Sequence, residues 1–356
     1  MDDSTSPSRP PTRLWVRTAT VRRVSTKPFI AARVEEFLDR RFEALFRALG
    51  WRELVVAYTG YGSHDFVRVM ARVVLVPQWS RSQLGRATKE FVKRRGWRSF
   101  VTAPCVRVPV TLTLGDRAVT VLSDRGGYLD HRVTRHSFEP GWHTVTAQTA
   151  QSRPAECPVL IVDDAAAFGL VSDIDDTILT TWLPRPMVAA WNSFVRDESN
   201  RQSIPGMARF YHRFLETHPG APLVYLSTGA WNTYDFLNRF IEQHRYPKGP
   251  LLLTDWGPTN TGWFRSGMEH KRTNLLRLAA DFPGVRWLLV GDDGQHDPEI
   301  YAEFAHSHPN HVAAVAIRQL SPTEQVLAHG TNMPLDEREP PVEADDAWVE
   351  APDGRG

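Results

Sequence analysis

The sequence has only two cysteines, no long apolar run, no excess of one charge and no hydrophobic N-terminal segment. Cys105 and Cys157 stand in apolar surroundings, so we expect two buried thiols, with a single disulfide as the alternative. The apolar runs fall short of the ~18 residues that span a bilayer, and residues 1–11 lack the apolar core of a secretory signal. A net charge of +1 argues against generic nucleic-acid binding. We therefore expect a cytoplasmic protein, free or peripheral at the membrane.

The chain of 356 residues is long enough for about two domains of ~150 residues each. Its 42% apolar and 23% charged residues are typical of globular proteins, and no oligomeric state follows from them. Composition and periodicity divide the chain further. We expect a disordered basic arm over 1–28, a helical and β-rich region with a basic segment over 29–103, a small β-sandwich over 104–163, an α/β domain over 164–321 and an acidic, disordered tail over 322–356.

The N-terminal third alternates between helical and strand patterns. Apolar residues recur at helical spacing over 31–49, and the balanced polar face favours packing on a core over lying on a membrane. Residues 66–76 are typical of a strand. The segment 81–98 carries seven Lys or Arg against one Glu, which indicates either a solvated helix face, the favoured reading, or contact with anionic lipid. Short alternating segments separated by turns over 106–162 predict the β-sandwich.

From Phe168 onward, strand and helix patterns alternate, which predicts a parallel sheet covered by helices, in a Rossmann-like α/β domain. The expected strands are 168–172, 222–227, 251–254, 286–291 and 312–317, and the expected helices are 186–196, 206–216, 234–244, 271–281 and 298–306.

Three carboxylates directly follow the first of these strands: Asp173, Asp175 and Asp176, closed by Thr177. The carboxyl edge of a parallel sheet is where such domains bind ligands. Three acidic side chains so close together repel one another unless a cation lies among them, and a hard divalent metal fits oxygen ligands. The alternative is a turn with solvated carboxylates.

Polar clusters follow two more predicted strands. Ser227, Thr228 and Gly229 precede a helix, where exposed N–H groups bind phosphate, although a plain helix cap explains most such sequences. The run 291–297 adds a second acidic cluster, Asp292, Asp293 and Asp297. Lys271, which opens a predicted helix, is either solvated or placed to neutralise charge. Together these groups suit metal-assisted phosphoryl transfer better than any one of them alone.

The pattern Asp173-Ile-Asp175-Asp176-Thr177 resembles the first motif, Asp-x-Asp-x-Thr, of the haloacid dehalogenase (HAD) superfamily of phosphatases. Ser227, Lys271 and the run 291–297 resemble its other three motifs, in the same order. More narrowly, these motifs and the pair His270-Lys271 are similar to the actin-patch-associated (App1-like) phosphatidate phosphatases, also described in bacteria as a domain of unknown function. The resemblance spans about 159–321 and extends more loosely to Gly60-Tyr61-Gly62.

The resemblance implies a role for each motif residue. Asp173 would attack phosphorus and form an aspartyl-phosphate, and Asp175 would protonate the leaving oxygen and then activate water. Ser227, with Thr228 and Gly229, would bind the phosphoryl group, and Lys271 would stabilise the nucleophile and the intermediate. A larger set would hold Mg²⁺, as the one cofactor: Asp173, the Asp175 main-chain carbonyl, Asp292, and Asp293 or Asp297 in support.

Two departures from the family pattern concern the substrate. The second motif continues Ser-Thr-Gly-Ala-Trp, where the fungal members read closer to Ser-Asn-Ser-Pro-Trp, and Asp293 stands where Ser is common. Only about fifty residues separate Thr177 from Ser227, which leaves room for a flap but no large cap domain, and an open site suits a bulky or membrane-bound phosphomonoester. Nearby aromatic and apolar residues either meet acyl chains or belong to the core: Trp182, Leu183, Trp231, Trp256, Trp263 and Phe264. The alternatives are a phosphatase for soluble phosphomonoesters and a non-catalytic module that binds anionic lipid.

Overall fold

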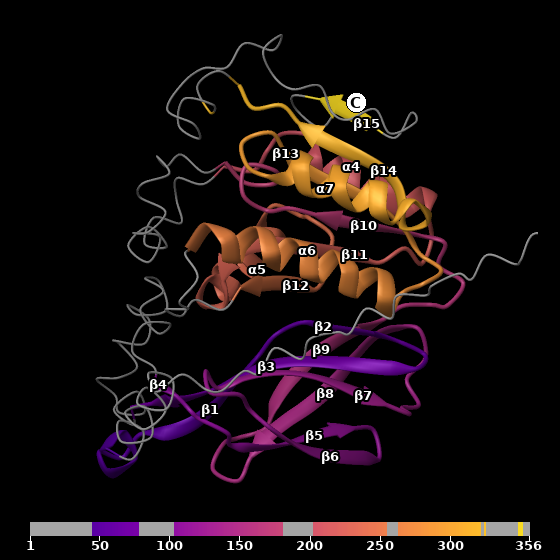
Figure 1. The fold of residues 1–356 in the computed structure, drawn as a ribbon. Coiled ribbons are helices and arrows are strands. Elements are labelled where there is room, and N and C mark those ends of the chain that lie inside the picture. The colour runs from indigo at the N-terminus through magenta and orange to yellow at the C-terminus, as the bar shows by residue number, and fades with distance from the viewer. Residues whose placement is uncertain are drawn as a thin grey trace, which may run out of the picture.

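The computed structural model describes residues 45–77, 103–180, 202–254, 263–321, 324 and 348–351. The predicted basic segment 81–98 and helix 186–196 lie outside these ranges, and the predicted helix 31–49 is described only from Leu45. Trp182, Leu183 and Trp256 also lie outside them, as do the side chains of Trp263 and Phe264. Figure 1 shows two β-sheets stacked one above the other, with helices around the upper one. Among the described helices, none combines the length and apolar character needed to cross a bilayer.

The N-terminal sheet has nine strands, and all of their pairings are antiparallel except that of β2 with β9. The main path runs β1-β3-β2-β9-β8-β5-β6, and both β4 and β7 pair with β3. The strands are β1 (Arg52–Ala57), β2 (Gly60–Ser63), β3 (Phe66–Val76), β4 (Ala103–Pro104), β5 (Pro109–Leu114), β6 (Arg117–Leu122), β7 (Tyr128–Thr134), β8 (Gly141–Thr149) and β9 (Ala155–Ile161).

Hydrogen bonds join these nine strands into one continuous sheet. The predicted boundary at residues 103/104 falls inside it, because β3 pairs with β4, which spans that boundary, and with β7 beyond it. This connectivity does not confirm the small β-sandwich predicted over 104–163. The strand predicted over 66–76 matches β3 in full. Cys105 and Cys157 are both buried as free thiols, so the disulfide alternative is wrong.

The second sheet has six parallel strands in the order β12-β11-β10-β13-β14-β15. Five of them lie within three residues of the predicted ranges, and β15 comes from the acidic tail, where no strand was predicted. The central β10 pairs with β11 on one side and β13 on the other, so the order of the strands reverses there. The strands are β10 (Phe168–Ser172), β11 (Leu223–Ala230), β12 (Leu251–Thr254), β13 (Arg286–Asp292), β14 (Val312–Arg318) and β15 (Trp348–Ala351).

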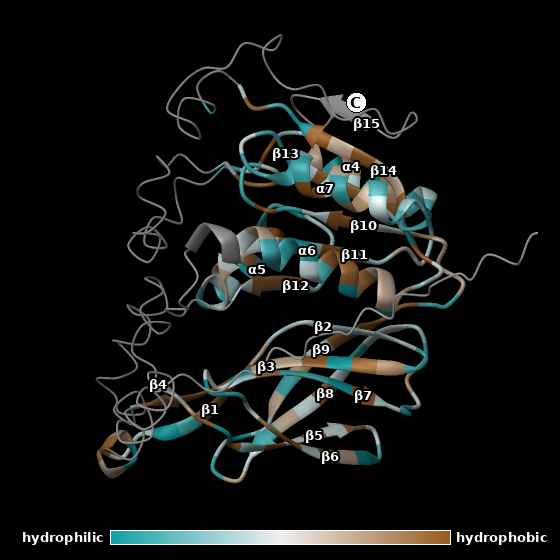
Figure 2. Cartoon of the chain, in the orientation of Figure 1, coloured by the Kyte–Doolittle hydropathy of each residue, from teal (hydrophilic) through white to brown (hydrophobic). Residues whose placement is uncertain are grey.

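Helices cover this sheet, which explains why β10, β12 and β13 are buried along almost their whole length. The helices are α4 (Met207–Thr217), α5 (Tyr234–Gln243), α6 (Trp263–Asp281) and α7 (Asp297–Ser307), with short 3₁₀ turns at η5 (Trp231–Thr233) and η6 (Pro309–His311). Helix α6 begins eight residues before its predicted start. In Figure 1, α6 and α7 lie side by side in front of the sheet. Figure 2 shows a mixture of hydrophilic and apolar residues along these helices and mostly apolar residues on the strands behind them.

The two sheets share part of their core. Tyr58, Tyr61, Phe66 and Met70 of the N-terminal sheet pack in the same apolar cluster as the strands and helices of the parallel sheet. Tyr61 also donates a hydrogen bond from its hydroxyl to Asp281 Oδ2 at the end of α6, at 2.9 Å. The N-terminal sheet therefore packs tightly against the half of the molecule that contains the parallel sheet.

The close approach of β10 to β13 depends on Gly169. A Cβ at this position would lie 2.5 Å from the ring of Trp287, which is buried and cannot move aside. We expect Gly169→Ala to lower the free energy of unfolding by about 1–3 kcal/mol, measured by urea denaturation. Gly284→Ala is the matched control, since nothing lies within 4 Å of its added methyl group. Equal stability of the two variants would contradict this packing.

Candidate active site

The predicted acidic motif forms the loop that leaves the centre of the parallel sheet. Asp173 follows β10 directly, and its backbone N–H donates to Val290 O of β13 at 2.8 Å. The loop then turns sharply through Asp176, whose φ of 59° is in the left-handed region that Asp adopts more readily than most residues. The Asp176 carbonyl accepts a hydrogen bond from Arg318 Nη1 at 2.8 Å. The turn brings the carboxylates back over the edge of the sheet.

Lys271 is the centre of the site. Its side chain is only 2% exposed, and its ammonium group donates to Asp173 Oδ1 at 2.7 Å and to Asp297 Oδ1. Asp173 and Asp297 are also buried. Three elements thus meet at one buried charge: the end of β10, the helix α6 and the first turn of α7. Buried charges persist only when they are paired and hydrogen-bonded, as these are.

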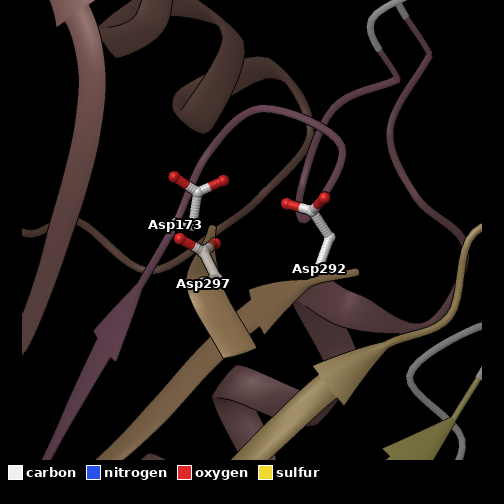
Figure 3. Close-up of side chains that lie close together, drawn as sticks. All are labelled: Asp173, Asp292 and Asp297. Atoms are coloured by element: carbon white, nitrogen blue, oxygen red, sulfur yellow. The ribbon is translucent and has the colours of Figure 1, made fainter. Parts of the chain in front are cut away.

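Asp292 lies at the end of β13, next to this pair. Its Oδ1 accepts from the Gly294 N–H at 2.7 Å, and its Oδ2 accepts from the Thr177 hydroxyl at 3.3 Å. Figure 3 shows Asp173, Asp292 and Asp297 grouped in one region of the sheet edge. Oxygen atoms of these three carboxylates all lie within 4.8 Å of one another.

Ser227 lies on the other side of the Asp173 loop. Its hydroxyl donates to Asp175 Oδ2 at 3.2 Å and accepts from the Gly229 N–H at 2.9 Å. The carbonyl of Thr228 accepts from the Thr254 hydroxyl at 3.0 Å, which ties this segment to the end of β12. The second motif therefore contacts the first through the Ser227 hydroxyl and the Asp175 carboxylate.

Burial and charge act against each other in this cluster. Burial raises the pKa of Asp173 well above its usual range, and the neighbouring Lys271 opposes that shift. Burial likewise raises the pKa of Asp292, and the nearby carboxylates add to the effect. For Lys271, burial lowers the pKa, but the attraction of Asp173 and Asp297 outweighs it, so the net shift is upward. One buried ammonium group thus faces three carboxylates, an excess of negative charge that a divalent cation would offset.

Two buried carboxylate oxygens of this cluster have no hydrogen-bond partner within the described part of the protein and are open to a ligand. Among the described residues, Asp173 Oδ2 and Asp297 Oδ2 are buried without a hydrogen-bond partner. Hard divalent cations prefer carboxylate oxygens, so Asp173, Asp292 and Asp297 could bind such an ion. Asp293 points elsewhere, because its Oδ1 accepts from the Leu320 N–H at 2.8 Å. The Asp175 side chain lies outside this group of three and bonds Ser227 instead.

Arg318 was missed by sequence analysis. It is buried at the end of β14, and its Nη1 donates to the Asp176 carbonyl. Its Nη2 donates to both carboxylate oxygens of Glu324, at 2.8 and 3.0 Å. Its position just after the predicted strand 312–317 could have indicated that it lies at the sheet edge near the site. Its partner, a main-chain carbonyl, cannot be read from a sequence. Arg318 therefore holds the turn of the acidic loop through a hydrogen bond to its main chain.

The region that contains these residues is similar in sequence to a known protein family. Residues 168–319 match the family described as "Phosphatidate phosphatase APP1, catalytic domain". The phosphatidate phosphatase APP1 of Saccharomyces cerevisiae is 31% identical over 153 residues, which are 42% of this chain and 26% of that protein. An uncharacterized protein of Schizosaccharomyces pombe is 25% identical over 167 residues, 47% of this chain and 27% of that protein. The predicted resemblance to App1-like phosphatidate phosphatases is thus confirmed for this region.

The chain spans only about a quarter of the length of these two relatives. A carbohydrate acetylesterase from Xanthomonas citri overlays on 77% of this chain and 72% of its own, at 9% identity. Its TM-score of 0.26 is too low to support an argument about the fold or the activity.

The buried ion pairs make a prediction about stability. Lys271→Met would leave Asp173 and Asp297 buried without their cation, and removal of one partner of a buried pair costs about 3–5 kcal/mol. We expect a loss of that size in urea denaturation with EDTA present. Arg272→Met is the matched control, since Arg272 pairs with the exposed Glu299 and Glu303 and should cost no more than about 1 kcal/mol. A Lys271 variant as stable as the control would contradict the charge arrangement.

Proposed function

We propose that residues 164–321 form a HAD-type phosphatase domain with a Rossmann-like parallel sheet, which removes the phosphate of phosphatidate or a related lipid phosphate with Mg²⁺ as its cofactor. One observation carries the proposal: the buried group of Asp173, Lys271, Asp292 and Asp297 lies inside the region that matches the phosphatidate phosphatase family. A domain that only bound lipid would have no need of such a costly buried group.

Asp173 is the proposed nucleophile. Lys271 holds its Oδ1, which leaves Oδ2 as the oxygen free to attack. Attack on phosphorus forms the bond from Oδ2 to phosphorus and breaks the bond to the oxygen of the lipid alcohol, so that an aspartyl-phosphate results. The Lys271 ammonium group stays beside the new ester and stabilises the charge of the transferred group.

Asp175 is the proposed acid and base. It lies two residues beyond the nucleophile, and its carboxyl group gives a proton to the departing lipid oxygen. It then takes a proton from the water that attacks the aspartyl-phosphate, which releases inorganic phosphate and restores Asp173. In the structure Asp175 Oδ2 accepts from Ser227, so the Ser227 hydroxyl is available to turn its proton toward a phosphoryl oxygen when substrate binds. Thr228 and Gly229 would complete this phosphate-binding segment.

The carboxylates that fit a metal ion are those that would hold Mg²⁺. Asp173, Asp292 and Asp297 supply side-chain oxygens, and the Asp175 main-chain carbonyl would add a fourth. Bound Mg²⁺ would neutralise charge on the phosphoryl oxygens. Asp293 would act in support, because its carboxylate holds the Leu320 N–H and so fixes the loop that carries Asp292.

The proposed nucleophile is tested by phosphate release from phosphatidate in mixed micelles. We expect Mg²⁺-dependent release by the wild type and none above background by Asp173→Asn, because the amide cannot form the ester. Asp164→Asn, a change at an exposed neighbour, should keep full activity. Activity on an aryl phosphate but not on phosphatidate would keep the chemistry and exclude the lipid substrate. No release from either ester would favour the lipid-binding module.

The metal ligands are tested by the Mg²⁺ concentration that gives half-maximal activity. Asp292→Asn should raise it well over ~10-fold, because loss of even an outer-shell partner typically costs 10–100-fold in metal affinity. Asp293→Asn should raise it less, since that side chain bonds Leu320 and lies outside the group of three carboxylates. Equal effects of the two substitutions would show that the ligands are assigned wrongly.

A further inference from the structure

A cavity of about 730 Å³ lies between the N-terminal sheet and the catalytic half of the molecule. Its size is within the ~300–1,000 Å³ of small-molecule sites, which often lie between domains. Strands β3, β6 and β7 line it on one side, and η5, β12 and α6 on the other. None of the proposed catalytic residues lines it. Its apolar and aromatic walls are formed by Tyr58, Met70, Tyr128, Leu129, Trp231, Leu252 and Leu253.

Helix α6 connects this cavity to the active site. Lys271 and the buried Leu275 and Leu278 follow helical spacing on the side of α6 that packs on the catalytic core. A second row of residues, also at helical spacing, lines the cavity: His270, Thr273, Asn274 and Arg277. One helix thus carries the active-site lysine on one face and the polar wall of the cavity on the next.

The polar groups of the cavity are largely satisfied within the protein. Burial lowers the pKa of His270 to about 4, so its imidazole is neutral near pH 7, and it bonds Leu252 O at 3.3 Å and Asn274 Nδ2 at 3.2 Å. Four charged side chains also line the cavity: Asp124, Asp130, Glu269 and Arg277. Arg277 bonds Asp130 at 3.1 Å, Asp124 Oδ1 accepts from the Gly126 and Tyr128 N–H groups, and Glu269 is exposed. The lining therefore makes little demand for a charged ligand and suits an apolar chain with a few uncharged polar groups.

Trp231 brings the cavity close to the phosphate-binding segment. It comes four residues after Ser227, so at most ~14 Å of chain separates them. Its ring stacks on Tyr58 of the N-terminal sheet at 4.3 Å. Next to this pair, the Thr59 N–H donates to the Tyr234 hydroxyl at 2.9 Å. The N-terminal sheet thus holds the turn that follows the phosphate-binding segment and forms the facing wall of the cavity.

From this arrangement we propose that the cavity receives one acyl chain of the lipid phosphate whose phosphoryl group reacts at Asp173. The inference rests on the proposed function and adds a role for the N-terminal sheet, which would take part in selecting acylated over small phosphate esters. An apolar chain is the ligand that the apolar walls favour, since most of the polar lining groups are already bonded within the protein. The position of Trp231 relates the chain site to the phosphate site.

The kinetic test fills the cavity without touching the catalytic residues. Thr273 is exposed on α6 and lines the cavity, whereas Leu276 is exposed on the same helix and does not. We expect Thr273→Phe to lower kcat/KM for lysophosphatidate by roughly tenfold or more, mainly by raising KM. The value of kcat/KM for p-nitrophenyl phosphate should stay almost unchanged. Leu276→Phe should change neither. Equal loss on both substrates, or loss on neither, overturns the proposal.

A binding test decides the matter even if no ester is hydrolysed. With EDTA present, a lysophosphatidate with a brominated chain should quench tryptophan fluorescence, and Trp231→Phe should remove most of that quenching. Thr273→Phe should weaken this binding and Leu276→Phe should not. No quenching of Trp231 overturns the chain site independently of the phosphatase activity. A brominated fatty acid that quenches Trp231 without inhibiting release from lysophosphatidate would show a separate lipid site and also overturn the proposal.

Discussion

The buried ammonium group of Lys271 is the constraint on which the site depends. Two carboxylates from different elements, Asp173 and Asp297, turn inward only because this cation lies between them. In water the attraction between these charges would be weak, but burial makes it strong and makes an unpaired charge costly. The single positive charge holds Asp173 at one oxygen and leaves an excess of negative charge toward Asp292. That excess is what makes the sheet edge suited to a divalent cation and then to a phosphoryl group.

The N-terminal sheet packs against the parallel-sheet half of the molecule and forms one side of the cavity between them. Its residues share the catalytic core, bond the last turn of α6 through Tyr61 and stack on Trp231 beyond the phosphate-binding segment. Because α6 presents Lys271 to one side and a row of cavity-lining residues to the other, a shift of this helix would affect both places at once. In the proposed function, the neighbouring sheet in this way contributes contacts to the substrate.

The sequence indicated much of the catalytic half, because period and strand-end chemistry are local signals. The strands 168–172 and 251–254 were predicted to the residue, and Asp173, Ser227 and Asp292 were expected at the ends of the predicted strands 168–172, 222–227 and 286–291. The sequence left two alternatives open for Lys271, a solvated side chain or one that neutralises charge. What it could not give depends on contacts distant along the chain. The support of Asp176 by Arg318, the different orientations of Asp292 and Asp293, and the single N-terminal sheet that crosses the predicted boundary all belong to this class. Nor did any pattern point to the cavity, whose walls come from both sheets.

The central claim is that Asp173 carries the phosphoryl group during the reaction. The most direct measurement is mass spectrometry of the protein mixed with phosphatidate and Mg²⁺ and quenched in acid within the first turnover. We expect one added phosphoryl group on the peptide that contains Asp173, and none in Asp173→Asn. Steady turnover of phosphatidate with no such adduct at any quench time would contradict this claim.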